Sequence, residues 1–201
     1  MSAAAKKSFA WSKGVEKSVK AHIAKYPEGK QQSAVMPLLD LAQRQNGGWL
    51  SQECIEYVAT YLDMPAMKVM EVATFYTMYI LKPIGRHHVQ VCGTTPCWLR
   101  GSDKIMAAAS KKLGIKKGET TKDGKFTLSE VECQGACVNA PMVMIDDDFY
   151  EDLTEESVTD ILESYAKGKM PKAGPQNTRH TSEPEGGLTT LKTALDSVGD
   201  A

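Results

Sequence analysis

The chain lacks the features of a membrane protein or of a nucleotide-binding enzyme. No stretch approaches the roughly 18 consecutive apolar residues of a membrane span. The first residues, MSAAAKKSFAWS, have no apolar core such as a secretory signal needs. The glycines never form G-x-G-x-x-G, and GETTKDGKF lacks the spacing of a P-loop. We therefore expect a protein without a membrane span that does not bind NADH alone, and no catalytic nucleophile or acid–base pair is evident.

Positive charge is missing from a long stretch of the second half. From Phe126 to Ala166 there is no Lys or Arg but there are eleven Asp and Glu, whereas Lys104 to Lys125 includes seven lysines. An acidic face repels phosphate backbones and suits a basic protein surface. We therefore expect a protein partner and no nucleic acid, although an ordinary solvated surface explains any single residue equally well.

Cysteine is scarce, yet four of the five cysteines form two close pairs. Cys92 and Cys97 are spaced C-x4-C, and Cys133 and Cys137 are spaced C-x3-C. Loops of small residues let backbone N–H groups approach metal-bound sulfur. Such donors are expected from Gly93, Thr94, Thr95, Gly135 and Ala136.

Three kinds of centre fit four such thiols. On spacing alone, tetrahedral zinc ranks first, an iron–sulfur cluster second and a pair of disulfides last. The odd cysteine count and the expected reducing compartment, cytosolic or mitochondrial, count against disulfides. Cys54 is the remaining cysteine and is predicted to pack inside a helical core. The histidines are expected at the surface or at strand ends, and they are His22, His87, His88 and His180.

Periodicity divides the chain into residues 1–82, 83–169 and 170–201. The first part is predicted to hold helices over 12–26, 33–45, 51–62 and 65–79, with a core stripe of Met67, Met70, Phe75 and Met78. The second part predicts a strand ending at Cys92, a helix to Leu113 and a strand ending at Cys133, which together form one parallel crossover. A hairpin of MVMI and FYEDL and a helix capped by Thr154 follow. Both cysteine loops thus follow strand ends, where open α/β sheets place functional sites.

Four runs carry a family resemblance: EVATFYTMY, CGTTPCWLRGSD, ECQGACVNAPMVMIDDDFYEDLT and GPQNTRHTSEPEGGLTTL. They resemble the small peripheral [2Fe–2S] subunit of respiratory complex I, over residues 10 to 190. The resemblance implies an α+β chain in which an N-terminal helical bundle precedes a thioredoxin-like α/β domain that carries an iron–sulfur cluster. It also implies one [2Fe–2S] cluster, held by Cys92, Cys97, Cys133 and Cys137, with FMN and NADH bound only on a partner protein.

The same resemblance implies a one-electron transfer subunit of NADH:quinone oxidoreductase that is not catalytic alone. Its expected partners are the FMN- and NADH-binding flavoprotein and other peripheral-arm subunits of complex I. The expected place is the cytoplasmic side of a bacterial inner membrane, as a peripheral subunit, or the matrix side in a mitochondrion. The alternatives are the equivalent subunit of an NAD-linked hydrogenase or formate dehydrogenase, and a zinc-stabilised interaction module.

Two details extend these expectations. Gln134 stands where the family more often has an apolar residue, and its amide is predicted to donate a hydrogen bond to a sulfur. The tail from 171 to 192 is predicted to be mobile in the isolated chain and to dock on the flavoprotein through Arg179, Leu188 and Leu191.

Overall fold

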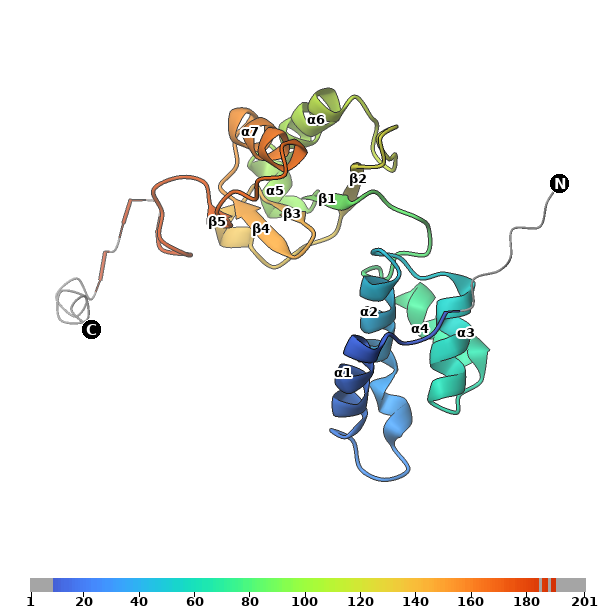
Figure 1. The fold of residues 1–201 in the computed structure, drawn as a ribbon. Coiled ribbons are helices and arrows are strands. Elements are labelled where there is room, and N and C mark those ends of the chain that lie inside the picture. The colour runs from blue at the N-terminus through green and yellow to red at the C-terminus, as the bar shows by residue number, and fades with distance from the viewer. Residues whose placement is uncertain (1–8, 185, 188, 191–201) are drawn as a thin grey trace. The chain divides into compact units, whose positions relative to one another are not determined.

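The computed structural model describes residues 9–184, 186–187 and 189–190. The chain divides into two compact units, one up to Ile84 and one from Gly85 (Figure 1). Across the described residues, no helix combines the length and the apolar character needed to cross a membrane.

Helices build the first unit. They are α1 (Lys13–Ile23), the 3₁₀ turn η1 (Gln31–Ala34), α2 (Val35–Gln45), α3 (Gln52–Tyr61) and α4 (Ala66–Phe75). After α2, Gly47 and Gly48 adopt φ angles of 76° and 90°, a region that glycine enters without strain, so the helix cannot continue. At the start of α3, the Ser51 hydroxyl accepts a hydrogen bond from the Cys54 N–H at 3.3 Å.

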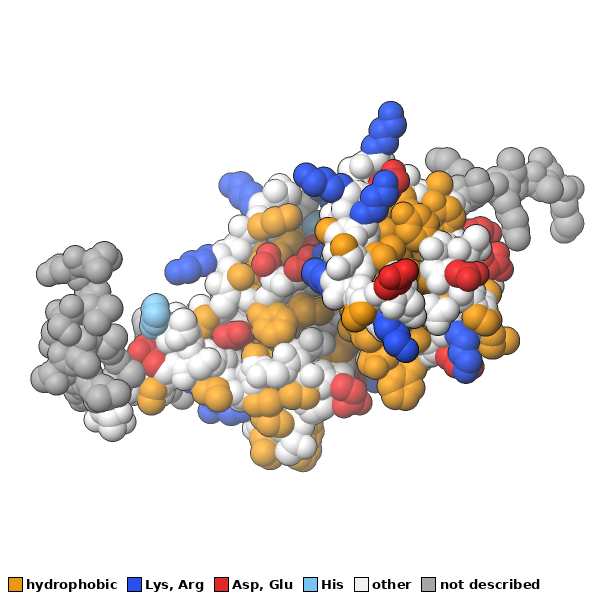
Figure 2. All heavy atoms as spheres, turned by 90° about the horizontal axis from the view of Figure 1, so that it is seen from below, with side chains coloured by type: hydrophobic (Ala, Val, Ile, Leu, Met, Phe, Trp, Pro, Cys, Tyr) orange, Lys and Arg blue, Asp and Glu red, His pale blue; other side chains and the backbone are white. Residues whose placement is uncertain are grey.

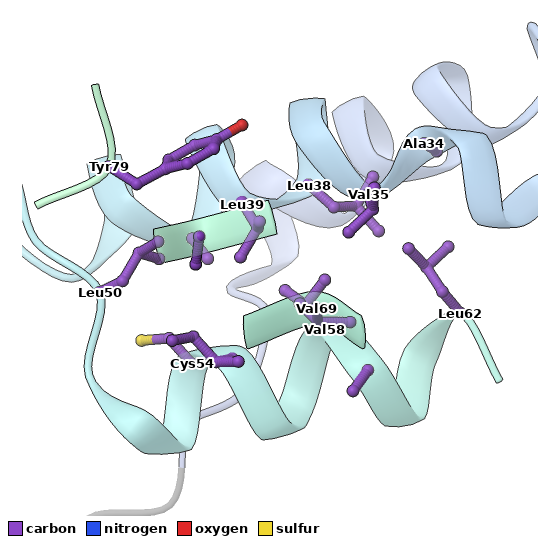
Figure 3. Close-up of a cluster of buried hydrophobic side chains, with 14 of the residues drawn as sticks. Ala34, Val35, Leu38, Leu39, Leu50, Cys54, Val58, Leu62, Val69 and Tyr79 are labelled. Carbon is purple, nitrogen blue, oxygen red and sulfur yellow. The ribbon is translucent and has the colours of Figure 1, made fainter. Parts of the chain in front are cut away.

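The core of the first unit lies between α2, α3 and α4 (Figure 3), where the fully buried Leu39, Val58 and Val69 meet. Cys54 is also fully buried there, which confirms its predicted packing role. The labelled core residues are Ala34, Val35, Leu38, Leu39, Leu50, Cys54, Val58, Leu62, Val69 and Tyr79.

The predicted core stripe on α4 is wrong for three of its four residues. Met67, Phe75 and Met78 are 69%, 77% and 53% exposed, whereas Met70 is partly buried against the core. The fully packed residues of α4 are instead Val69 and Ala73. These two residues are four apart, so they lie on one helical face. The helix ends at Phe75, so Met78 lies beyond it and does not continue a helical stripe.

A mixed sheet with the strand order β2-β1-β3-β4-β5 forms the frame of the second unit. β1 (His87–Cys92) pairs in parallel with β2 (Phe126–Val131) and antiparallel with β3 (Val143–Ile145). β4 (Asp148–Glu151) pairs antiparallel with β3 and in parallel with β5 (Gly174–Pro175). The predicted parallel crossover and the predicted hairpin are therefore confirmed.

Helices α6 (Ser102–Leu113) and α7 (Glu155–Ala166) pack side by side (Figure 1), with α6 against β1 and β2. Thr154 caps α7 as predicted, because its hydroxyl accepts a hydrogen bond from the Ser157 N–H at 3.2 Å. The residues predicted to face inward from α7 are all buried, namely Val158, Ile161, Leu162 and Tyr165. Helices and sheet together confirm the α+β class.

The segment after α7 does not match the expectation of a mobile tail. β5 adds to the sheet, and the Gln176 N–H donates to the Glu151 carbonyl at 2.9 Å. The Arg179 side chain is only 6% exposed. Residues 174–181 therefore pack on their own domain, while Leu188 and Leu191 lie outside the described residues.

Candidate metal centre

The first cysteine pair joins the end of β1 to α5 (Thr95–Leu99). Cys92 is the last residue of β1, and its N–H donates to the Met142 carbonyl at 3.3 Å, so the sheet fixes its position. Cys97 lies in α5, and both cysteines are 1% exposed. Between them, the Gly93 N–H donates to the Val131 carbonyl at 3.1 Å, which ties this loop to the end of β2.

In the second pair, Cys133 lies in the loop after β2 and Cys137 begins the 3₁₀ turn η2 (Cys137–Asn139). Cys133 and Cys137 are exposed, and their Sγ atoms are 3.3 Å apart. Gly135 reverses the chain between them with a φ of 85°, which L-residues rarely adopt. Its N–H then points at the Cys133 sulfur and donates to it at 3.4 Å.

The two loops lie next to each other. Helix α5, which holds Cys97, contacts η2, which begins at Cys137, and Ala136 packs against the cluster of Cys92 and Cys97. Thr94 hydrogen-bonds Cys92, with its Oγ1 3.3 Å from the sulfur. Within the described part of the chain, no group of three or more His, Cys, Asp or Glu is arranged as for a single metal ion. The four sulfurs form two pairs.

In each pair, the pKa values of the two thiols are shifted in opposite directions. Burial raises the pKa of Cys92, but hydrogen bonds, first from the Thr94 hydroxyl, outweigh it and leave that pKa below its usual value. Burial and the hydrogen bond with Cys92 raise the pKa of Cys97 to about 12. In the exposed pair, the Gly135 N–H lowers the pKa of Cys133, and the hydrogen bond to that sulfur raises the pKa of Cys137. Because metals bind thiolates, loading the site releases the protons of any neutral thiols.

The donors around the sulfurs test whether an iron–sulfur cluster fits. The Gly135 N–H donates to the Cys133 sulfur at 3.4 Å, and the Thr94 hydroxyl lies 3.3 Å from the Cys92 sulfur. Hydrogen bonds to sulfur stabilise the negative charge of thiolate-ligated iron and tune its potential. Four thiols with such donors fit a [2Fe–2S] cluster, which takes four cysteine ligands.

Sequence reasoning found part of this donor set. The N–H donor predicted from Gly135 is confirmed, whereas Thr94 meets the Cys92 sulfur through its hydroxyl and the Gly93 N–H bonds to the Val131 carbonyl instead. The contact of Met142 with the first pair, whose Cys92 N–H donates to the Met142 carbonyl, was missed, because it depends on how the chain folds back on β1. A hydrogen bond from the Gln134 side chain remains a prediction.

Paired thiols in two loops at the ends of parallel strands define a ferredoxin-type metal-binding domain. A family model described as "Thioredoxin-like [2Fe-2S] ferredoxin" matches residues 19–166. The chain belongs to this family, and its predicted thioredoxin-like fold is confirmed.

Curated relatives are similar over most of their length. One is a subunit of the NADH-quinone oxidoreductase of Rickettsia prowazekii (strain Madrid E), which is 64% identical over 74% of this chain and 85% of the relative. Another is "NADH dehydrogenase [ubiquinone] flavoprotein 2, mitochondrial" of Dictyostelium discoideum, 54% identical over 84% of this chain and 68% of the relative. The resemblance drawn from the sequence is confirmed by both.

A likeness to a solved structure extends to the fold. The crystal structure of an NAD+-reducing [NiFe]-hydrogenase in the air-oxidised state matches with a TM-score of 0.56 and 18% sequence identity. The match covers 65% of this chain and 23% of that chain. At this identity the match concerns the fold alone.

Proposed function

We propose that this chain is the [2Fe–2S] electron-transfer subunit of an NADH-quinone oxidoreductase, and that Cys92, Cys97, Cys133 and Cys137 hold the cluster. The observation that carries the proposal is the gathering of two thiol pairs, with N–H and O–H donors to their sulfurs. The identity of 64% to a protein named as part of that enzyme supports the assignment to this complex.

When bound, a [2Fe–2S] cluster supplies a one-electron redox couple at these four sulfurs. The chain's own residues then do two things. The buried pair Cys92–Cys97 anchors the site in the sheet, and the donors Thr94 and Gly135 stabilise negative charge on sulfur. The exposed pair Cys133–Cys137 leaves one side of the site open toward a redox partner.

The partner assigned here is the FMN- and NADH-binding flavoprotein, beside other peripheral-arm subunits of complex I. Apolar side chains reach the surface on the face shown in Figure 2. Among the described residues, large exposed apolar side chains include those that directly follow two of the cysteines. Trp98 and Leu99 follow Cys97 and are 61% and 71% exposed, and Val138 follows Cys137 and is 65% exposed. A flavoprotein seated on them would exclude water from the electron-transfer path.

We also propose where the chain acts and how its parts divide the work. The chain is a peripheral subunit on the cytoplasmic side of a bacterial inner membrane, or on the matrix side of a mitochondrial one. Residues 1–82 form a helical region, 83–169 the cluster domain and 170–201 an extended tail that docks on the partner. Because residues 174–181 pack on the chain's own domain, the docking role falls to other parts of the tail.

The second candidate is the equivalent subunit of an NAD-linked hydrogenase. The fold likeness to an NAD+-reducing [NiFe]-hydrogenase favours it, but the sequence identity to that protein is only 18%. The identity to the NADH-quinone oxidoreductase relative is 64%, which favours the first candidate. Purification of the native assembly, followed by identification of its subunits, separates the two. Quinone-reductase subunits together with an FMN protein support the proposal, whereas a nickel–iron subunit supports the alternative.

The metal itself is tested on the full chain purified alone. A red-brown protein with equal iron and acid-labile sulfide, and an electron paramagnetic resonance (EPR) signal on reduction, supports the cluster. A colourless protein that holds zinc in place of iron supports the zinc-stabilised interaction module and contradicts the proposal.

A further inference from the structure

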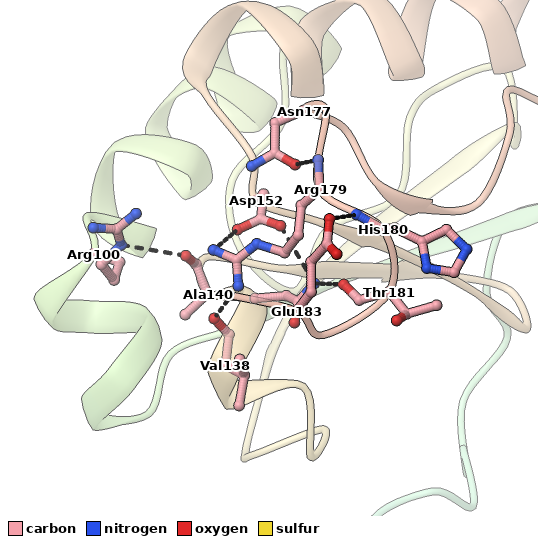
Figure 4. A network of polar contacts seen from close by, with 10 residues as sticks. Arg100, Val138, Ala140, Asp152, Asn177, Arg179, His180, Thr181 and Glu183 are labelled. Carbon is pink, nitrogen blue, oxygen red and sulfur yellow. Dashed lines mark hydrogen bonds and ion pairs between the residues drawn. The ribbon is translucent and has the colours of Figure 1, made fainter. Parts of the chain in front are cut away.

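The C-terminal segment crosses the chain just beyond the second cysteine pair (Figure 4). Arg179 and Asp152 form an ion pair with 3.2 Å between Nη2 and Oδ1, and their side chains are only 6% and 4% exposed. Burying two charges costs several kcal/mol for each ion unless both are paired and hydrogen-bonded. A tail that only increased solubility would keep its arginine in water, so the buried ion pair indicates that this segment has a structural role.

The buried pair is tied to the segment that follows Cys137. Arg179 Nη1 donates to the Val138 carbonyl at 3.1 Å. Asn139 is 1% exposed, and its side-chain amide donates to the Thr181 carbonyl at 2.7 Å and to Asp152 at 3.3 Å. In return, the Asp152 N–H donates to the Asn139 carbonyl at 2.8 Å. One ion pair thus fixes two consecutive residues of this segment.

The first cysteine loop reaches the same segment. Arg100, which directly follows α5, donates from Nε to the Ala140 carbonyl at 3.4 Å (Figure 4). Cys137 itself is exposed, so burial does not hold its side chain in place. Its position therefore depends on the backbone of Val138 and Asn139, which is where Arg179 and Asp152 bind.

We propose that Arg179, Asp152 and Asn139 form a latch that positions Cys137 for the cluster, with Arg179 as its central positioning residue. The inference rests on the proposed four-cysteine site. Arg179 suits this role because its planar fork donates in two fixed directions, one to a carboxylate and one to a carbonyl. The segment around Arg179 consequently belongs to the metal site.

The test uses the full chain with Arg179→Ala and Arg179→Lys. The control is Glu163→Gln, which breaks the exposed ion pairs of Glu163 with Lys112 and Lys167. Visible absorbance follows cluster loss to an iron chelator, EPR-monitored titration gives the line shape and the potential, and far-UV circular dichroism reports folding. Arg179→Ala should release the cluster about 10- to 100-fold faster, the usual cost of losing a partner that orients a metal ligand.

Arg179→Lys should fall between Arg179→Ala and wild type, because lysine keeps the charge but lacks the fork. Glu163→Gln should match wild type in every readout. A folded Arg179→Ala protein with wild-type chelation rate, line shape and potential would overturn the latch. If Arg179→Ala fails to fold, Arg179→Lys decides, and a wild-type rate for it overturns the proposal. A wild-type chain without a cluster would instead count against the proposed function, so the two failures are distinguishable.

Discussion

Gly135→Ala should separate the effect of a single N–H···S hydrogen bond from general loss of stability. Gly135 has a φ of 85° and lies between the exposed cysteines, where its N–H donates to the Cys133 sulfur at 3.4 Å. A Cβ at this position meets nothing within 4 Å, so the change introduces backbone strain without a clash. The loop can relieve that strain by rotating toward negative φ, which turns the N–H away from the sulfur.

The backbone strain sets the expected loss of stability, and the lost hydrogen bond sets the expected change in potential. An L-residue in the left-handed region costs about 1–2 kcal/mol, so the free energy of unfolding should fall by about that amount. One hydrogen bond contributes roughly 1 kcal/mol, and for a one-electron couple a difference of 1 kcal/mol corresponds to about 40 mV. Because donors to sulfur stabilise the more negative reduced state, their loss lowers the potential. Gly135→Ala should therefore lower the midpoint potential by tens of millivolts.

Gly118→Ala is the matched control. Gly118 also has a φ of 85°, and a Cβ added there meets nothing within 4 Å, but its N–H donates to the Leu128 carbonyl at 2.7 Å. EPR-monitored redox titration and urea unfolding are measured on both variants. Both should lose similar stability, and only Gly135→Ala should change the potential. Equal potentials in the two variants would refute the role given to this N–H.

Three further outcomes are expected. Thr94→Val removes the hydroxyl 3.3 Å from the Cys92 sulfur, so redox titration should show a potential lower by tens of millivolts, about 40 mV for each kcal/mol lost. Leu39→Ala opens a cavity in the core of the first unit and should cost about 2–5 kcal/mol in urea unfolding while leaving the cluster spectrum unchanged. Burial lowers the pKa of His88, so the folded chain holds it neutral, and stability is lost as pH falls below the unfolded value of about 6.5. His88→Gln should therefore show a smaller loss of urea midpoint than wild type between about pH 7 and pH 5.

Local patterns predicted the frame of the metal site well. The alternating residues before Cys92 and the strand before Cys133 form β1 and β2 in parallel, as the crossover required. Close cysteine pairs and small loop residues are short-range signals, so the four thiols could be named in advance. The spacing alone did not choose between zinc and iron, because both take four thiolates.

The errors arise where tertiary contacts decide. The strand-end position expected of His87 and His88 is confirmed at the start of β1. Their burial was not expected from the sequence, and it depends on contacts such as that of Asp146 in the hairpin, 2.7 Å from the His87 Nδ1. The apolar stripe on α4 could not show which of its faces meets the core. Arg179 pairs with Asp152, which is distant in the sequence. Composition does not show such a partner, so it predicted a mobile tail.

The most direct test of the four-cysteine site is the iron and sulfide content, with the EPR signal, of five single Cys→Ser variants. Changing any one of Cys92, Cys97, Cys133 or Cys137 should abolish or severely distort the cluster, because oxygen is a harder and poorer ligand for it than sulfur. Cys54→Ser should keep the wild-type signal, since Cys54 is fully buried in the core of the other unit. The ligand set would be contradicted if Cys54→Ser lost the cluster while a serine variant of Cys92, Cys97, Cys133 or Cys137 kept it.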